Sequence, residues 1–329
     1  MTRHNHRLLF FLTALLFIFI TALSTFAQVE ADHARRSQQK IPWLGPHVFV
    51  PNNLIRDPFI AGYIRNSTGA GVSVKTRVPA IILSDSLIIG NLDASIAAVV
   101  VQFEYQHAVK DWLAVWGRLD IAGRLGTNEQ SLISQGVNFI SGFELGWMFR
   151  LVEAHRDALS LTVAMESNNG SFINLLEWVD RILVEGEIAP DNQLIRKKES
   201  LRGKVGLRYA HVFSPLFGLS ANGELGYGEK LDQPGENKTT YLIGAGLSCN
   251  LHGKTKVPLG AYLGYSLNNL AEGGSELRDN VQSGVFRIAY TGHSDFLVST
   301  DLGFTSTPVT RLDQTIKITT FKINLRYYF

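Results

Sequence analysis

The chain has 329 residues and a formal net charge of +2, with 45% hydrophobic and 18% charged residues. The charged fraction is below the roughly 25% usual for soluble proteins, and beyond the N-terminus no apolar run approaches the roughly 20 residues that a membrane helix needs. The composition therefore argues against both a soluble enzyme and a helical membrane protein, and the charge gives no argument for nucleic-acid binding.

Residues 1–27 have the three parts of a secretory signal peptide. Arg3 and Arg7 precede the apolar run 8–23, and the small residues Thr25 and Ala27 occupy positions −3 and −1 of a predicted cleavage site after Ala27. Cleavage removes two arginines and no acid, which leaves a mature chain of balanced formal charge. The sequence therefore predicts export. The alternative is an uncleaved membrane anchor. A lipid-modified N-terminus is not expected, because no cysteine follows the apolar run.

Residues 28–68 form the second predicted region, an N-terminal extended segment. Its first part, up to about residue 40, is polar, and its second part contains Pro42, Pro46, Pro51 and Pro58. Prolines at this density exclude a regular strand ladder, because proline has no backbone N–H to donate. We expect an extended segment that either enters the domain that follows as a plug or lies beneath it.

From residue 69 to residue 329, apolar and polar residues alternate with a period of two, which indicates β-strands. Segments such as 112–126 and 315–329 exceed the five or six residues usual in soluble strands and suit a tilted bilayer crossing, which takes ~9–11 residues. Aromatic residues beside tight connections are typical of a membrane girdle. The predicted strands are 69–82, 94–107, 112–126, 136–150, 158–168, 199–213, 216–230, 239–250, 258–270, 281–291, 296–306 and 315–329, with 58–65 as a further candidate.

The connections between these strands alternate in length. Those on the side of the C-terminus, such as 214–215, are short and should be periplasmic, whereas the opposite side has longer ones. In the longest, residues 169–186 place apolar side chains at helical spacing and predict a short amphipathic helix in an outer loop. The predicted fold is all-β: a transmembrane antiparallel up-and-down β-barrel of about 12 strands over residues 69–329, with that one helix.

The terminal strand carries a resemblance. In FKINLRYYF, the residues Phe321, Ile323, Leu325, Tyr327 and Phe329 share one face, and the chain ends on an aromatic ring. With the signal peptide, this pattern resembles bacterial outer-membrane β-barrel proteins, and porin-like channels are the nearest group. The resemblance implies a place in the outer membrane of a Gram-negative bacterium and contact with its lipids. It also implies that the outer-membrane assembly machinery recognises these five residues.

Many charged residues should face the lumen if the odd-numbered residues of the last strand face lipid, since a charge in hydrocarbon costs a few kcal/mol. Bases outnumber acids in this set, which favours a water-filled channel with a mild anion preference. The alternative is a barrel filled with ion-paired side chains. The candidates for lining and selectivity are Arg118, Asp120, Arg124, Glu144, Arg202, Lys204, Arg208, Glu224, Arg287, Lys322 and Arg326.

No catalytic residue, cofactor or metal is expected. Ser167-Asn168-Asn169-Gly170 is similar to a stretch of outer-membrane lipid hydrolases, but that family has a histidine two residues before the serine, where this chain has Met165. Without a base beside it, Ser167 is a weak nucleophile. The histidines fall at different predicted turns, too far apart for all of them to bind one metal ion.

The sequence thus predicts a passive channel for small polar or anionic solutes, with no enzymatic activity. The main alternative is a closed barrel with a structural, adhesive or partner-binding role, and an outer-membrane lipid hydrolase comes third. A lumen blocked by residues 41–68 would favour the closed barrel. The solute and the oligomeric state stay open.

Overall fold

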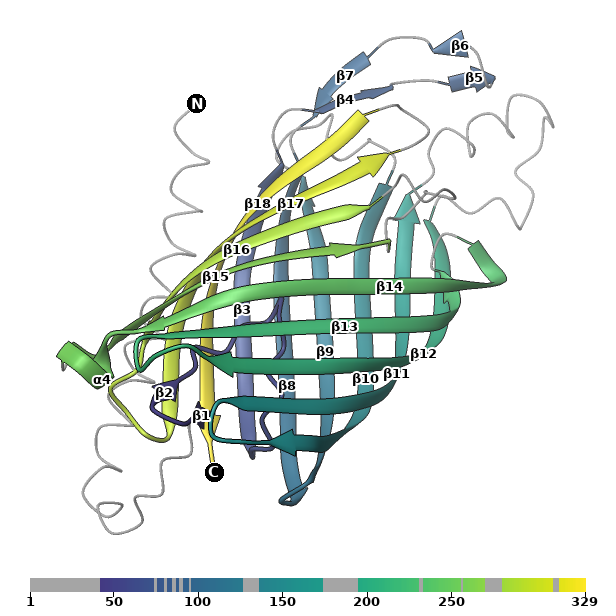
Figure 1. Ribbon diagram of the computed structural model, residues 1–329. Coiled ribbons are helices and arrows are strands. Elements are labelled where there is room, and N and C mark those ends of the chain that lie inside the picture. Colours follow the sequence, from purple (N-terminus) through teal and green to yellow (C-terminus); the bar gives the residue numbers. More distant parts are fainter. Residues whose placement is uncertain are drawn as a thin grey trace. The chain divides into compact units, whose positions relative to one another are not determined.

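Twelve strands of the chain form one closed antiparallel barrel in the computed structural model (Figure 1). Neighbours in sequence pair with one another, and β18 pairs with β3 to close the ring. This confirms the predicted all-β, twelve-stranded barrel. The strands are β3 (Tyr63–Ser73), β8 (Ile96–Lys110), β9 (Leu113–Gly126), β10 (Gly136–Glu153), β11 (Asp157–Ile173), β12 (Ile195–Val212), β13 (Phe217–Lys230), β14 (Gln233–Asn250), β15 (Leu259–Asn268), β16 (Val281–Tyr290), β17 (Phe296–Val309) and β18 (Gln314–Tyr328).

The structure describes part of the chain. The described residues are 42–73, 76–79, 82–84, 87–88, 91–94, 96–126, 136–173, 195–230, 233–255, 257–269, 280–309 and 314–329.

The first barrel strand begins earlier than predicted. β3 starts at Tyr63 rather than at residue 69, and it ends at Ser73. Residues 76–79 and 82 of the predicted strand 69–82 belong to two small sheets, in which β4 (Thr76–Pro79) pairs with β7 (Asn91–Ala94) and β5 (Ile82–Ser84) with β6 (Leu87–Ile88). The outward face of β3 contains Asn66 and Thr68, whose side chains hydrogen-bond to each other at 3.1 Å. These polar residues interrupt the apolar alternation and conceal the start of the strand in the sequence.

The predicted helix over 169–186 is not confirmed. Residues 169–173 belong to β11, where they pair with β12, and residues 174–186 lie outside the described residues. A one-turn helix, α4 (His252–Thr255), lies in the connection between β14 and β15. None of the described helices has the length and apolar character to cross a membrane.

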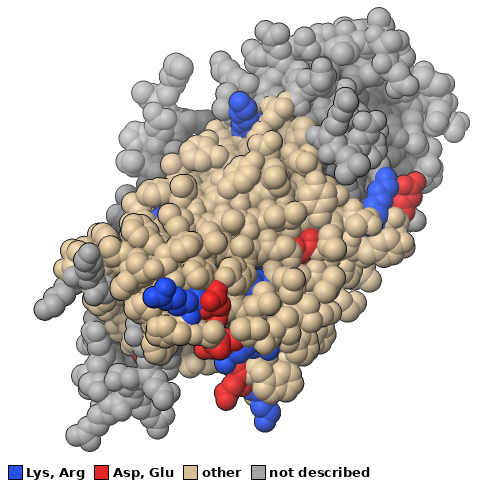
Figure 2. All heavy atoms as spheres, in the orientation of Figure 1, with Lys and Arg blue, Asp and Glu red and all other residues tan. Residues whose placement is uncertain are grey.

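The barrel wall has an apolar exterior and a polar interior. On β12, Leu201 and Leu207 are 53% and 48% exposed, whereas their neighbours Arg202 and Arg208 are 7% and 6% exposed. The same alternation runs along β18, from exposed Phe321 to exposed Phe329. Figure 2 shows a broad face over the strands with few charged side chains. This arrangement reverses that of a soluble protein and is that of a transmembrane barrel, because only lipid favours large apolar side chains outside and charges within.

Residues 42–62, the lumen segment, lie inside this wall. Hydrogen bonds join the segment to eight strands, namely β3, β8, β10, β11, β12, β14, β16 and β18. Because these hydrogen-bond partners lie on strands around the barrel, the wall encloses the segment. Its apolar residues pack against inward wall residues in four clusters, of which the largest joins Val50 and Ile55 to Tyr262 and Leu297. The core of this barrel is therefore built around the segment.

The segment begins and ends at the end of the barrel with the short connections. Its first hairpin, β1 (Trp43–Leu44) and β2 (His47–Val48), turns at Gly45, which has φ +53° and no room for a side chain beside the carbonyl of His155. His47 contacts the carbonyl oxygen of Pro215, in the tight turn after β12. At the other end, the carbonyl of Gly62 accepts a hydrogen bond from the N–H of Phe329. Residues 42–62 thus form a loop that enters and leaves on the same side.

Candidate functional site: the occupied lumen

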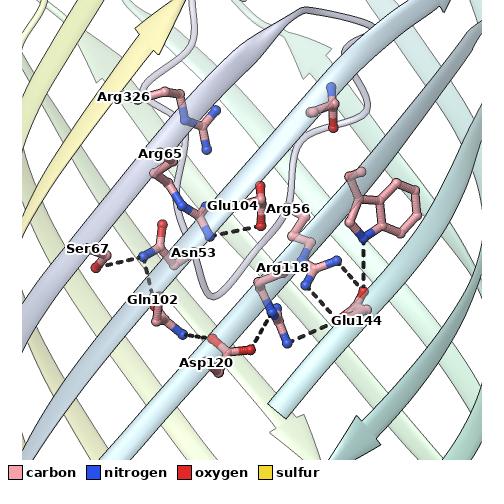
Figure 3. A network of polar contacts seen from close by, with 12 residues as sticks. Asn53, Arg56, Arg65, Ser67, Gln102, Glu104, Arg118, Asp120, Glu144 and Arg326 are labelled. Atoms are coloured by element: carbon pink, nitrogen blue, oxygen red, sulfur yellow. Dashed lines mark hydrogen bonds and ion pairs between the residues drawn. The ribbon is translucent and has the colours of Figure 1, made fainter. Parts of the chain in front are cut away.

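The lumen segment is anchored at its tip by an amide. The side-chain nitrogen of Asn53 lies 3.2 Å from Ser67 Oγ, 3.2 Å from Gln102 Oε1 and 3.1 Å from Asn324 Oδ1. These partners come from β3, β8 and β18, on one side of the lumen (Figure 3). All three lie near the middle of their strands, so the tip reaches about halfway along the wall.

Further around the same stretch of wall, Glu144 of β10 is the centre of a charge cluster (Figure 3). Arg56 of the lumen segment binds it through two nitrogens, at 2.7 and 3.0 Å. Arg118 Nη2 and Lys204 Nζ reach it at 3.0 and 3.1 Å, and Trp116 donates to it at 3.2 Å. The Glu144 side chain is 1% exposed. A buried carboxylate is tolerated only with such partners. The segment therefore supplies one of the cations that Glu144 needs, and the wall supplies the acid that Arg56 binds.

Arginines of the wall hold the backbone and the acid of the segment. Arg326 forms an ion pair with Asp57 at 3.3 Å, and Arg208 lies 3.5 Å from the Asp57 carbonyl oxygen and 4.7 Å from the centre of the Trp116 ring. Arg287 donates to the carbonyl of Pro51 and binds Asp301 through two nitrogens, at 2.5 and 2.7 Å. The side chains of Arg208, Arg287 and Arg326, which the sequence predicts to line a channel, therefore hold the lumen segment in place.

The segment leaves the lumen beside β8. Gln106 donates to the carbonyl oxygens of Phe59 and Ala61, at 3.1 and 3.0 Å. Next to it, buried Glu104 accepts hydrogen bonds from Tyr63 and from Arg65, the latter at 2.9 Å. Paired buried charges of this kind add order to the wall only when every partner is satisfied.

A histidine fixes the entrance of the segment. His47 is fully buried, with Nδ1 3.0 Å from the Pro215 carbonyl oxygen and Nε2 3.2 Å from Ser248 Oγ. A carbonyl only accepts, so Nδ1 carries the proton and Nε2 accepts from the Ser248 hydroxyl, which itself accepts from the N–H of Val50 at 2.9 Å. Burial lowers the pKa of His47 below its ordinary value of 6.5, which favours this neutral form of the imidazole.

Beyond the tip of the segment lies a cavity of about 110 Å³, the lumen cavity. Its wall combines the segment with β9 and β11–β14 and includes four cations, Arg56, Arg118, Arg202 and Lys204, but only two acids, Glu166 and Glu224. Lys204 lies 3.1, 3.0 and 3.4 Å from Glu144, Glu166 and Glu224. The remaining lining residues are Asn53, Leu54, Asn222, Gly226, Thr240, Tyr241 and Leu242.

The predicted lumen residues fall into two groups. Arg118, Glu144, Arg202, Lys204 and Glu224 gather around the lumen cavity, and Asp120 joins them through Arg118, whose Nε lies 2.6 Å from its carboxylate. Arg208, Arg287 and Arg326 instead hold the lumen segment. Lys322 lies on the inward face of β18 opposite Asp301. Arg124 lies on β9, but its side chain is outside the described part of the chain.

The sequence prediction missed the residues contributed by the lumen segment itself. Asn53, Arg56 and Asp57 supply the tip amide and both charges of the segment. A signal was present, because these residues stand between Pro51 and Pro58 in a stretch that cannot form a ladder and must still satisfy its polar groups. Without the register of the wall, however, their partners could not be assigned.

The proposed assembly residues share the outward face of β18. Phe321, Tyr327 and Phe329 are 54%, 38% and 43% exposed, and Ile323 and Leu325 are partly exposed. The Phe329 ring stacks on Tyr105 of β8 with centroids 5.8 Å apart. Their role in recognition stays a proposal.

The structure also places the residues considered for chemistry. Ser167 and Met165 lie on the outward face of β11, and Met165 is 52% exposed. Within the described ranges, no group of three or more His, Cys, Asp or Glu side chains is arranged to hold a metal ion.

Comparison with solved structures identifies other barrels at low sequence identity. The COG4313 outer membrane channel from Pseudomonas putida F1 is 12% identical, over 85% of this chain and 99% of that one, with a TM-score of 0.49. The translocator domain of the autotransporter NalP from Neisseria meningitidis is 7% identical, over 83% and 90%, with a TM-score of 0.47. The CymD monoaromatic hydrocarbon channel is 10% identical, over 82% and 89%, with a TM-score of 0.38. No model of a protein family matches the sequence, and no curated protein matches it either.

Proposed function

We propose that the chain is a passive channel for small polar or anionic solutes in the outer membrane of a Gram-negative bacterium, and that the lumen segment closes it. The observation that carries the proposal is the lumen cavity, where charged side chains surround open space inside a barrel with an apolar exterior. Charged groups in such a lumen bias the permeation of ions. Nothing in this function requires a catalytic residue.

The outer-membrane location rests on the exterior of the barrel. Apolar side chains such as Leu225 and Leu263, 58% and 63% exposed, would not be stable in water at this density. Closed β-barrels also satisfy all backbone groups within the membrane. Cell fractionation tests the location: the protein should sediment with outer membranes and migrate differently on gels with and without heating.

Conduction requires that the lumen segment moves. With residues 42–62 in place, the end with the short connections is filled by packed side chains such as Phe49 and Val50, which are 2% and 1% exposed. The polar anchors of the segment are contacts that water can replace once the segment leaves. Since both ends of the loop lie on the same side, it can withdraw toward the short connections without threading past the wall.

The experiment is single-channel recording of the refolded mature protein in a planar bilayer. The proposal expects infrequent openings in discrete steps, a preference for anions, and more frequent openings when the anchors of the segment are weakened. Arg56→Gln is the first variant, because it removes an anchor of the segment and leaves the wall unchanged.

A second candidate function is a closed barrel with a structural or partner-binding role. The observation that favours it is the number of strands that hold the segment, as expected if the lumen is filled permanently. A folded protein that never conducts, in the wild-type or in the weakened form, would establish this function over the channel.

A further inference from the structure

The lumen cavity contains a buried cation whose donors are incompletely used. The side chain of Arg202 is 8% exposed, and its one ion pair, to Glu166, is long at 3.4 Å. Its buried Nε has no hydrogen-bond partner within the described residues. A buried N–H without an acceptor is unfavourable, so this arginine can donate a hydrogen bond to an anionic oxygen in the cavity.

A second unused group lies on the neighbouring strand. Asn222 of β13 also lines the cavity, and its Oδ1 is buried without a hydrogen-bond partner in the described chain. Arg208 of β12 pairs with Asn222 in the strand register, so Asn222 and Arg202 belong to adjacent strands. An amide oxygen needs a donor, which an anion does not supply but a hydroxyl group does.

The charges around the cavity favour an anion over a cation. Four cations and two acids line it. The third acid that neutralises Lys204 is Glu144, which is buried behind the lining and bound by Arg56 and Arg118. Asp120 likewise pairs with Arg118 at 2.6 Å. Arg202, with its long ion pair to Glu166, is therefore the lining cation with the weakest compensation, and an anion can pair with it.

We propose that the lumen cavity is a binding site for a small hydroxylated carboxylate, with the carboxylate on Arg202 and a hydroxyl donating to Asn222. The site rests on the proposed function, since its ligand is a solute of the channel. It narrows the class of solute from polar or anionic molecules to hydroxy acids and sugar acids. Bound ligand would share Arg202 with Glu166.

Isothermal titration of the full mature protein in detergent tests the site, with gluconate as probe and glucose as the matched compound without a carboxylate. Saturable binding of gluconate and at least roughly tenfold weaker binding of glucose are expected. Arg202→Gln should weaken gluconate binding by roughly tenfold or more, and Asn222→Ala should weaken it less. Arg150→Gln is the matched control, because Arg150 forms an exposed ion pair with Glu153 away from the cavity. Heat-modifiable migration confirms folding of each variant.

The proposal is overturned if gluconate does not bind the folded wild-type protein, if glucose binds equally well, or if both cavity variants bind like the wild type. Asn222→Ala keeps the test decisive if Arg202→Gln fails to fold. Failure of the channel gives a different result: a protein that binds gluconate but never conducts contradicts conduction and leaves the site in place.

Discussion

Arg56 of the lumen segment and Glu144 of β10 form a two-point ion pair, with nitrogen–oxygen distances of 2.7 and 3.0 Å, inside the barrel. The pair joins residues far apart in the sequence and links the lumen segment to the cluster around the lumen cavity. Its two partners are not equivalent. Arg56 depends on Glu144, whereas Glu144 also binds Arg118 and Lys204.

The first prediction follows from this asymmetry. Glu144→Gln should destabilise the protein more than Arg56→Gln, because it leaves three cations without the acid they share. Removing one partner of a buried ion pair costs about 3–5 kcal/mol, and we expect Glu144→Gln to lie at the upper end of this range and Arg56→Gln at or below its lower end. Urea unfolding followed by tryptophan fluorescence measures both. Arg150→Gln, in an exposed pair, should cost about 1 kcal/mol or less. Equal effects of Glu144→Gln and Arg56→Gln would contradict the asymmetry.

The second prediction concerns the space that the wall leaves for the segment. A Cβ atom added to Gly244 of β14 would lie 2.2 Å from Ile55 Cδ1. Gly244→Leu should therefore push the tip of the segment out of place, at a cost of about 2 kcal/mol, and raise the frequency of channel openings roughly thirtyfold. Gly223→Leu is the matched control, because nothing lies within 4 Å of a Cβ atom at Gly223. If both variants open equally often, the effect does not come from the segment.

The third prediction is a dependence on pH at the entrance of the segment. Burial lowers the pKa of His47 below 6.5, so the docked segment holds a neutral imidazole. Docking is fully stable above pH 6.5, and it weakens as the pH falls below that value, because the released segment binds the proton more readily. Channel openings should increase between pH 6.5 and pH 5. His47→Gln should remove this increase. A variant that keeps the wild-type pH profile would assign the effect to another group.

The fourth prediction tests the outward face of β18. Deletion of Phe329 should lower the amount of barrel assembled in the outer membrane of cells, while the purified protein still refolds in detergent, since Phe329 is 43% exposed and its contacts are with Gly62 and the edge of β8. Heat-modifiable protein in membrane fractions measures assembly. Phe329→Tyr serves as the control, because it keeps an aromatic ring at this position. Normal assembly of the deleted form would remove the terminal residue from the recognition signal.

Sequence patterns predicted the barrel wall well because its physics is local. Alternation with a period of two depends only on neighbouring residues. It placed all twelve strands in overlapping ranges, the first only over residues 69–73, and it assigned Leu201 and Arg202 to opposite faces. The first strand was misplaced because Asn66 and Thr68 satisfy each other on the outer face. Such a compensation cannot be seen without the pairing of the strands.

The site was predicted only in part, because its decisive contacts join distant segments. The inward charges on β9, β10 and β12 could be phased from the sequence, but their partners could not. Arg208 and Arg287 were expected to line open water, whereas they hold the carbonyls of Asp57 and Pro51. Whether the proline-rich stretch 42–58 enters a barrel or lies beneath it depends on the shape of the barrel interior. The alternation of apolar and polar residues carries no information about that shape.

The central claim is that residues 42–62 close a channel and can leave it. The most direct test is the single-channel conductance of the wild-type protein and the Arg56→Gln variant, refolded under the same conditions and checked for heat-modifiable migration. We predict infrequent discrete openings in the wild type and the same conductance step, opened far more often, in the variant. Folded proteins that both remain silent would contradict the channel and identify a permanently filled barrel.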